Sequence, residues 1–198
     1  MSEKLCCGGE PITLIVLCGG GSRRMKKDKA LLTVDGDTLI ERVIGRLGSF
    51  FDEVLLSVGQ DGGFDFFPWR KVVDGTPDLG PMEGIRSALA VSYTEHNAVV
   101  ACDMPDVTID PLRQMAGRAP DFDVVVPCCP GGRLEPLFAF YSRTCLPAMT
   151  ALLGSGERSL LPLFERMRTY YTVLEDCSSL QSLNTPRDYE DYLKRNRG

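Results

Sequence analysis

Residues 12–29 of this chain read ITLIVLCGGGSRRMKKDK, and this stretch decides the fold. Its first part, from Ile12 to Cys18, is an apolar run typical of a buried central strand. A glycine-rich loop follows at once, and cations follow the glycines. Glycines allow backbone N–H groups to approach phosphate oxygens, and arginine and lysine side chains neutralise the phosphate charge. This order of strand, glycine loop and cations predicts a site for a triphosphate.

Two well-known phosphate-binding loops do not fit these residues. A P-loop requires Gly-Lys-Ser/Thr after a four-residue gap from its first glycine, and position 24 is arginine. The dinucleotide-binding fingerprint requires a third glycine to pack the helix against the strand. Here Ser22, Arg23 and Arg24 follow the glycine triplet. A plain glycine turn with solvated basic residues is the alternative, and the loop by itself does not reject it.

Composition indicates an ordinary globular protein. The chain has 198 residues, of which 43% are hydrophobic and 25% charged, so we expect one domain over residues 1–198 with a flexible N-terminus over residues 1–10. A net charge of -5 argues against a nucleic-acid partner, because general nucleic-acid binders are usually basic. The cations crowd into one loop, which indicates a small anionic ligand. They are Arg23, Arg24, Lys26, Lys27 and Lys29.

Targeting signals and cysteine usage favour the cytoplasm. No apolar run approaches the roughly 20 residues that span a bilayer, and residues 1–10 carry no hydrophobic signal segment, so we expect no membrane partner. The eight cysteines form no C-x-x-C pair and His96 is the only histidine, a spacing that does not match a zinc site. A cytoplasmic chain with a good core does not need disulfides, so we expect reduced thiols, several of them buried.

Strands alternate with helices along the chain. We expect strands over residues 12–18, 53–58, 71–73, 98–102, 124–126, 134–141 and 171–174, with Pro127 ending the fifth. Expected helices cover residues 37–47, 83–93, 144–153, 159–167 and 186–194. Several strands are apolar on both faces, which predicts an α/β fold whose parallel sheet is covered by helices.

Candidate site residues come directly after three of these strands. Gly19, Asp74 and Asp103 each follow a strand end, and ligands bind beyond the carboxyl ends of strands in such sheets. Asp103 is the better metal candidate, because it follows an uncharged strand and Pro105 fixes the next turn. Asp74 could bind the metal through water or contact the nucleotide. Asp106 and Asp110 are better explained as helix or turn caps.

Five motifs, in order, resemble one known family. They are Leu17-x-Gly19-Gly20-x-Ser22-x-Arg24-Met25-x-x-Asp28-Lys29, Asp74 with Gly80-Pro81-Met82-x-Gly84, Cys102-Asp103-Met104-Pro105, Glu135-Pro136-Leu137, and Leu183-Asn184-Thr185-Pro186-x-Asp188. Together they are similar to the signature of the molybdenum cofactor guanylyltransferases, the MobA-type enzymes. The resemblance covers nearly the whole chain beyond the first ten residues.

The resemblance implies a three-layer sandwich with a mostly parallel Rossmann-like sheet, of the nucleotide-diphospho-sugar transferase type. It implies Mg²⁺-dependent transfer of GMP from GTP to the phosphate of molybdopterin, with release of pyrophosphate. Asp103 would hold Mg²⁺, and Arg24 and Lys29 would stabilise charge on the leaving pyrophosphate. The implied nucleotide-binding residues are Leu17, Cys18, Gly19, Gly20, Lys29, Asp74 and Asp103.

The same resemblance implies partners beyond GTP and molybdopterin, namely proteins that deliver the cofactor or target molybdoenzymes that receive it. Arg133, Arg143 and Arg158 could hold the phosphate or pterin of the acceptor, or they are ordinary surface arginines. The chain departs from the family pattern at three positions. They are Lys26 where glycine is usual, Cys18 where alanine is common, and Ser57 near a frequent asparagine.

Three alternatives stay open. A related transferase would use CTP or another phosphorylated acceptor. A regulatory domain would bind the nucleotide without catalysis, although the joint presence of Arg24, Lys29 and Asp103 argues against it. A cysteine-based metal or redox protein would contain bound zinc or iron, which the cysteine spacing disfavours.

Overall fold

A computed structural model describes residues 3–19, 29–59 and 64–196 of the chain. Its main sheet has eight strands. Seven form a path in the order β10-β7-β9-β6-β1-β4-β5, and β8 pairs with β7. Their bounds are β1 Thr13–Leu17, β4 Glu53–Val58, β5 Arg70–Val73, β6 His96–Ala101, β7 Val124–Cys129, β8 Arg133–Leu134, β9 Phe138–Ser142 and β10 Thr169–Val173. A small second sheet pairs β2 (Thr33–Val34) with β3 (Asp37–Thr38).

The main sheet is mostly parallel, as expected. β5, β4, β1 and β6 are parallel neighbours, and β10 is parallel to β7. β9 runs antiparallel to both β6 and β7. The carboxyl ends of six strands of the path therefore point to one edge of the sheet, which we call the rim. The opposite edge, where these strands begin, is called the amino edge.

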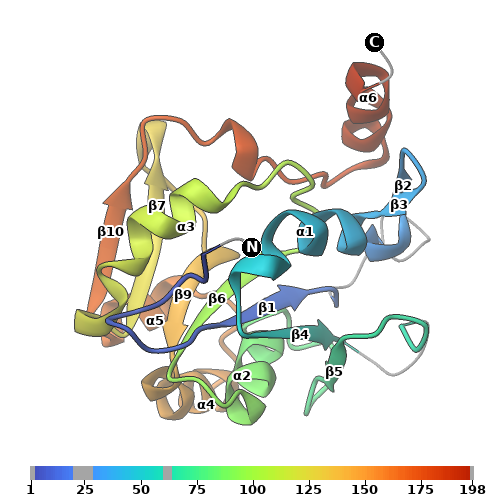
Figure 1. Ribbon diagram of the computed structural model, residues 1–198. Helices are drawn as coiled ribbons and strands as arrows, with labels where there is room; N and C mark the ends of the chain where they lie inside the picture. The colour runs from blue at the N-terminus through green and yellow to red at the C-terminus, as the bar shows by residue number, and fades with distance from the viewer. Residues whose placement is uncertain (1–2, 20–28, 60–63, 197–198) are drawn as a thin grey trace.

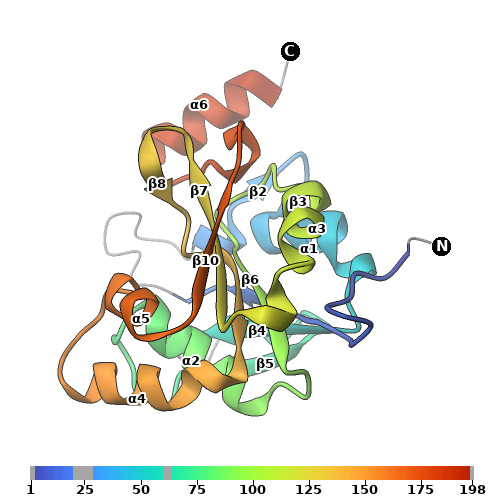
Figure 2. The same cartoon turned by 90° about the vertical axis from the view of Figure 1, so that its left-hand side faces the viewer.

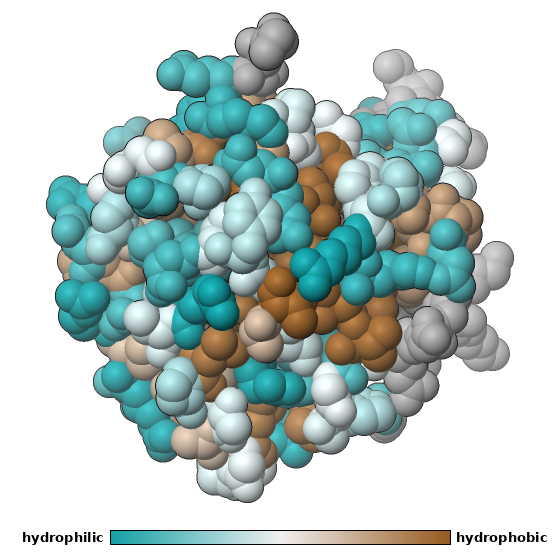
Figure 3. Space-filling model, turned by 60° about the horizontal axis from the view of Figure 1, so that its bottom comes forward, coloured by the Kyte–Doolittle hydropathy of each residue, from teal (hydrophilic) through white to brown (hydrophobic). Residues whose placement is uncertain are grey.

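Helices cover both faces of the sheet and complete the three layers (Figure 1). α1 (Leu39–Leu47) and α3 (Ile109–Ala116) lie on one face, and α2 (Pro81–Val91), α4 (Leu146–Gly154) and α5 (Leu161–Arg166) lie on the other. α6 (Pro186–Asn196) stands apart from both layers, at the top of both ribbon views (Figure 2). On the face turned forward in Figure 3, hydrophilic surface surrounds an apolar area near the middle.

The pleat of β1 divides the core into two layers. Leu14 and Val16 pack into the cluster under α1 and α3, whereas Ile15 and Leu17 pack into the cluster under α2, α4 and α5. Alternate side chains of a strand point to opposite faces, and all five residues of β1 are buried. An apolar run without polar alternation is therefore what this central position requires.

Local signals explain the first helix. Thr38 caps α1 by accepting from the backbone N–H of Glu41, whose side chain accepts from the Thr38 backbone N–H at 2.9 Å. This reciprocal capping box fixes the helix start, and Gly48 forms the C-cap. The apolar stripe of α1 faces the sheet and is buried, consisting of Leu39, Ile40, Val43, Ile44 and Leu47.

Proline did not end the fifth strand. β7 continues through Pro127 to Cys129. Backbone polar groups of alternate residues in a strand point to opposite neighbours. Val124 and Cys128 bond on the β10 side of β7, so the backbone of Pro127 faces the opposite side. There β9 pairs only with Val124 and Val125, so the missing N–H of proline breaks no bond to β9.

Other expectations about secondary structure also changed. The strand expected over residues 134–141 is split into β8 and β9, because Pro136 lies in the turn between them. α3 was not expected at all, since Pro111 obscures its helical pattern, although proline is compatible with a first helical turn.

Two of the described N-terminal side chains pack into the core, and the flexibility expected for residues 1–10 stays a prediction. Leu5 and Cys7 are buried, and Leu5 donates its N–H to Phe50 O at 2.7 Å. No helix in the ranges described above is both long and apolar enough to cross a membrane.

The expectation that all thiols are reduced is wrong for one pair. Cys129 and Cys177 form a disulfide, with their Cα atoms 5.9 Å apart. They meet because the parallel neighbours β7 and β10 both end at the rim, an adjacency that cannot be read from cysteine spacing. Of the six free cysteines, four are buried, as expected: Cys7, Cys18, Cys102 and Cys145.

Candidate active site

The rim brings the candidate residues of the sequence together. In the order β5-β4-β1-β6, Val73 pairs with Val58, Ser57 with Leu17, and Leu17 with Ala101. Asp74 directly follows β5, and Gly19 and Asp103 each lie two residues after the ends of β1 and β6. The predicted gathering of the three residues at one edge of a parallel sheet is therefore confirmed.

Gly19 lies against the neighbouring strand end. The N–H groups of Cys18 and Gly19 both donate to Ser57 O, at 2.8 and 3.1 Å. A Cβ at Gly19 would lie 2.2 Å from the backbone nitrogen of Gly59, so only glycine fits. In this conformation the Gly19 N–H is bonded within the protein. The glycine serves close packing of two strand ends rather than donation to an anion.

The side chains of Leu17 and Cys18 belong to the core. Both are buried, and they pack on opposite faces of the sheet. Gly20 and Arg24 lie outside the described residues. Lys29 opens the 3-10 turn η1 (Lys29–Leu31), and the structure describes its backbone only. The roles expected for Gly20, Arg24 and Lys29 thus stay predictions.

Asp74 carries an unpaired buried oxygen. Its backbone N–H donates to Val58 O at 3.0 Å, which fixes the residue at the end of β5. Its Oδ1 is buried and has no hydrogen-bond partner among the described residues. Burial and then the charge of Glu83 raise the pKa of Asp74 to about 6, against the lowering effect of Arg86. Such an acceptor favours a ligand that brings its own donor.

A clamp on α2 holds the loop after Asp74. Glu83 is 1% exposed and accepts from Arg86 Nε at 2.7 Å, Arg86 Nη2 at 2.6 Å and Thr76 N at 3.1 Å. The hydrogen bonds from Arg86 lower the pKa of Glu83, so this carboxylate stays charged. Ser87 Oγ accepts from Gly75 N at 3.1 Å and donates to Glu83 Oε1 at 3.1 Å.

Sequence patterns did not single out Glu83. A signal existed: Glu83 lies in the first helical turn with Arg86 three residues later, a spacing that places both on one helix face. Gly84 then brings α2 close to the rim, because a Cβ there would lie 2.7 Å from Ser57 Oγ and 3.5 Å from Asp74 Oδ1.

Asp103 occupies the turn after β6. Met104 N donates to Ala101 O at 3.3 Å to close this turn, and Asp103 O accepts from Leu183 N at 2.8 Å. Asp106 is not a cap, contrary to expectation. It accepts from Tyr192 OH at 2.7 Å and pairs with Arg46 at 3.6 Å. The C-terminal region thus holds the Asp103 loop at two points.

The closing motif of the sequence acquires a structural role. Thr185 Oγ accepts from Asp188 N at 3.1 Å, and Asp188 Oδ2 accepts from Thr185 N at 2.7 Å. This is a reciprocal capping box at the start of α6, with Pro186 at the favoured first helical position. The capping box lies between Leu183 and Tyr192, the two residues that contact the loop carrying Asp103.

Asp74 and Asp103 follow strands at different places along the rim. Their strands are separated by three strand spacings, or roughly 14 Å. Among the residues that the structure covers, no group of three or more His, Cys, Asp or Glu side chains could hold a metal ion. One carboxylate with phosphate and water ligands is the donor set that Mg²⁺ accepts on a triphosphate, so Asp103 fits this role. Asp74 fits the nucleotide rather than the same ion.

Glu135 lies near Asp103, in the turn between β8 and β9. Burial raises its pKa, its ion pair with Arg133 at 3.1 Å lowers it, and the charge of Asp103 raises it. Among the candidate arginines, Arg133 is at the rim. Arg143 is at the amino edge, where its backbone N–H donates to Glu95 O. Arg158 lies in the loop after α4, and its side chain donates to Leu153 O of that helix.

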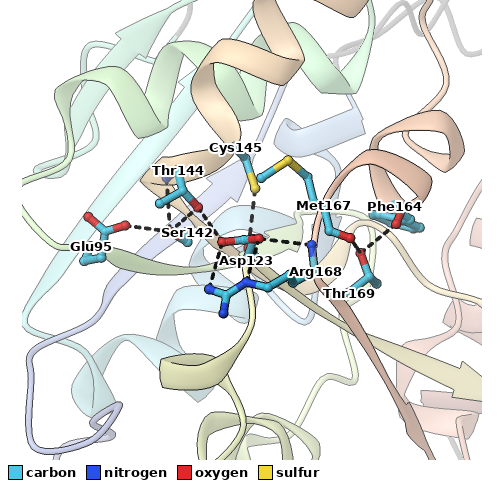
Figure 4. A network of polar contacts seen from close by, with 9 residues as sticks. All are labelled: Glu95, Asp123, Ser142, Thr144, Cys145, Phe164, Met167, Arg168 and Thr169. Atoms are coloured by element: carbon cyan, nitrogen blue, oxygen red, sulfur yellow. Dashed lines mark hydrogen bonds and ion pairs between the residues drawn. The ribbon is translucent and has the colours of Figure 1, made fainter.

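A second carboxylate cluster, around Asp123, lies at the amino edge (Figure 4). Asp123 Oδ2 accepts from Arg168 N at 3.0 Å, and Oδ1 accepts from Thr144 Oγ at 2.9 Å. Burial alone would raise the pKa of Asp123, but these hydrogen bonds and the Arg168 charge lower it below its ordinary value. This cluster joins β7, β10 and the start of α4, so we assign it to the fold.

Comparisons with known proteins agree with this geometry. The model of the MobA-like NTP transferase domain matches residues 14–169. A probable molybdenum cofactor guanylyltransferase of Pelotomaculum thermopropionicum is 35% identical, over 89% of each chain. The crystal structure of molybdopterin-guanine dinucleotide biosynthesis protein A from Archaeoglobus fulgidus shares the fold, with a TM-score of 0.81 at 23% identity over 93% of this chain and 98% of that one.

A third relative was crystallised with a metal. The structure of a Mycobacterium tuberculosis H37Rv protein in complex with manganese has a TM-score of 0.67 and 20% identity, over 93% of this chain and 98% of that one. At this identity the likeness concerns the fold alone.

Proposed function

The chain belongs to the MobA-like NTP transferase family, and from this premise we propose that it is a molybdenum cofactor guanylyltransferase. It transfers GMP from GTP to the phosphate of molybdopterin and releases pyrophosphate. The observation that carries the proposal is the rim, where an unpaired acceptor on Asp74 and the carboxylate of Asp103 flank the end of the glycine-loop strand.

The spacing along the rim suits an extended nucleotide. We assign Asp74 to the nucleoside end and Asp103 to the phosphate end, about 14 Å away along the strand ends. The N2 amine of guanine is a hydrogen-bond donor, and an ionised carboxylate only accepts. A buried, unpaired carboxylate oxygen therefore supports guanine as the base, with Ser57 close by on β4.

The chemistry needs positioning and charge stabilisation rather than a covalent enzyme intermediate. Asp103 would hold Mg²⁺, which when bound neutralises charge on the triphosphate. Arg24 and Lys29 are proposed to bind the leaving pyrophosphate, and the acceptor phosphate attacks the α-phosphorus in line. Leu183 and Tyr192 position the Asp103 loop from the C-terminal region.

A pyrophosphate-release assay with molybdopterin and Mg²⁺ tests the proposal. We expect turnover with GTP and little with CTP, and a loss of about 100-fold or more in kcat for Asp103→Asn. Asp110→Asn is the matched control, because Asp110 is an exposed aspartate paired with Arg113 on α3. A preference for CTP, or full activity of Asp103→Asn, would contradict the proposal.

A further inference from the structure

A hollow lies on the rim, on the side of Asp103 away from Asp74. It is a cavity of about 380 Å³ between the ends of β7 and β10. This volume is within the range of small-molecule sites. Its lining residues are Cys129, Pro130, Arg133, Cys177, Ser178 and Gln181.

Both walls of this hollow are tied to the loop of Asp103. One wall, the β7–β8 turn, continues through Glu135 to Leu137, whose O accepts from Ala101 N at 2.9 Å, at the end of β6 just before Asp103. The other wall, residues 177–181, continues to Leu183, whose N–H donates to Asp103 O at 2.8 Å. The Cys129–Cys177 disulfide joins the two walls to each other. The hollow is therefore held to the loop that carries the proposed metal ligand.

The chemistry of the hollow suits an anion attached to a polar ring. The side chain of Arg133 is 57% exposed, and among the described residues its guanidinium pairs with Glu135 alone. One oxygen of Glu135 contacts Nη1, which leaves further guanidinium N–H donors for a phosphate. On the opposite wall Gln181 adds an amide, whereas the Ser178 hydroxyl already donates to Asp176 Oδ2 at 2.8 Å.

We propose that this hollow is the acceptor subsite, in which Arg133 binds the phosphate of a phosphorylated pterin. The inference rests on the proposed function and deepens it, because it places the attacking phosphate on the far side of Asp103 from the nucleoside. It also separates the three candidate arginines. Arg143 is excluded by its position at the amino edge, and Arg158 by its bonds to the backbone of its own loop.

The test compares Arg133→Gln with Arg113→Gln. Arg113 is a matched control, since it is 49% exposed and pairs with Asp110 at 3.3 Å, but it lies on α3. For Arg133→Gln we expect KM for molybdopterin to rise about tenfold or more, because a hydrogen bond to a charged group is lost. KM for GTP should not change. Arg133→Lys should recover part of the loss. Arg113→Gln should behave as the wild type.

Direct binding separates failure of the subsite from failure of the proposed function. Molybdopterin binding without nucleotide is measured by its fluorescence for wild type and Arg133→Gln, and the variant should bind about tenfold more weakly. If wild type binds molybdopterin but forms no guanylylated product, the proposed function fails and the subsite stands. If Arg133→Gln keeps wild-type affinity and acceptor KM, or raises KM for both substrates equally, the subsite is wrong.

Discussion

The two edges of the sheet use half-buried carboxylates in opposite ways. At the amino edge, Asp123 receives hydrogen bonds from Arg168 and Thr144, and its pKa is lowered. At the rim, one oxygen of Asp74 has no hydrogen-bond partner in the described part of the chain, and the pKa of Asp74 is raised to about 6. Both residues flank a strand of the same sheet. A carboxylate that the chain itself satisfies belongs to the fold, whereas one that the chain leaves unsatisfied is available to a ligand.

The same contrast applies to how β7 and β10 are held together. At the amino edge, the Asp123–Arg168 contacts join the two strands. At the rim, the Cys129–Cys177 disulfide joins the last residue of β7 to the segment that follows β10. A covalent link therefore holds the rim ends of β7 and β10 together, whereas polar contacts hold their amino-edge ends.

The largest effect is expected from removing this disulfide. The bridge closes a loop between residues separated by 48 positions, so chain entropy predicts a loss of about 4 kcal/mol in the free energy of unfolding for the double variant Cys129→Ala/Cys177→Ala. Urea denaturation without reductant measures it. A thiol reductant should destabilise the wild type to a similar extent and leave the double variant unchanged.

Cys6→Ala provides the control, because Cys6 is an exposed free cysteine and its removal should alter nothing. If reductant leaves the unfolding curve of the wild type in place, the two sulfurs are not bonded in solution. The rim would then be held by packing alone, and the contrast between the two edges would weaken.

The next effect concerns the satisfied carboxylate. Asp123→Ala should lower the free energy of unfolding by about 2 kcal/mol, because the hydrogen bonds that Arg168 N and Thr144 Oγ donate to this charged group are lost. Activity per folded molecule should not change, since Asp123 is at the amino edge. Denaturation and pyrophosphate release are measured on the same sample, and a selective loss of activity would break the proposed division of roles.

The unsatisfied carboxylate should show the reverse result. We expect Asp74→Asn to lower kcat/KM for GTP by about 30-fold, because an amide replaces part of the acceptor with a donor. Its stability should be equal to or higher than that of wild type, since an unpaired buried carboxylate is unfavourable in the empty protein. If Asp74→Asn unfolds more easily and keeps full activity, Asp74 is a structural residue after all.

The sequence predicted the rim well because its signals are local. Apolar runs ending in Gly19, Asp74 and Asp103 specify strands and their carboxyl ends, and parallel pairing then brings those ends together. The first helix was also predictable, because Thr38 and Glu41 are a capping pair three residues apart.

What the sequence did not predict depends on contacts between distant residues. Tyr192 reaches Asp106 across 86 positions, and Cys177 reaches Cys129 across 48, so neither pair has a local pattern. Proline predicts a strand end at Pro127, but its missing N–H is costly only where a neighbouring strand needs that donor. The neighbour is known only from the sheet order.

The smallest effect is the pH dependence that the two carboxylates should produce. Asp74 has a folded-state pKa of about 6, raised from 3.8 by burial and by Glu83 on α2, against the effect of Arg86. Between about pH 4 and 6 the folded state therefore binds the extra proton, so this group's contribution to stability falls as pH rises. The pKa of Asp123 is lowered, so its contribution is present above its ordinary pKa and is lost as pH falls.

The activity profile should follow Asp74 alone. If the ionised form accepts from the base, kcat/KM for GTP should fall by about half between pH 7.5 and 6, near the pKa of Asp74. Asp74→Asn should lose this acid limb while keeping its low activity, and Asp123→Asn should keep the limb. A limb that persists in Asp74→Asn would belong to another group, such as Glu135, whose raised pKa and place beside Asp103 would then make it the titrating residue of the rim.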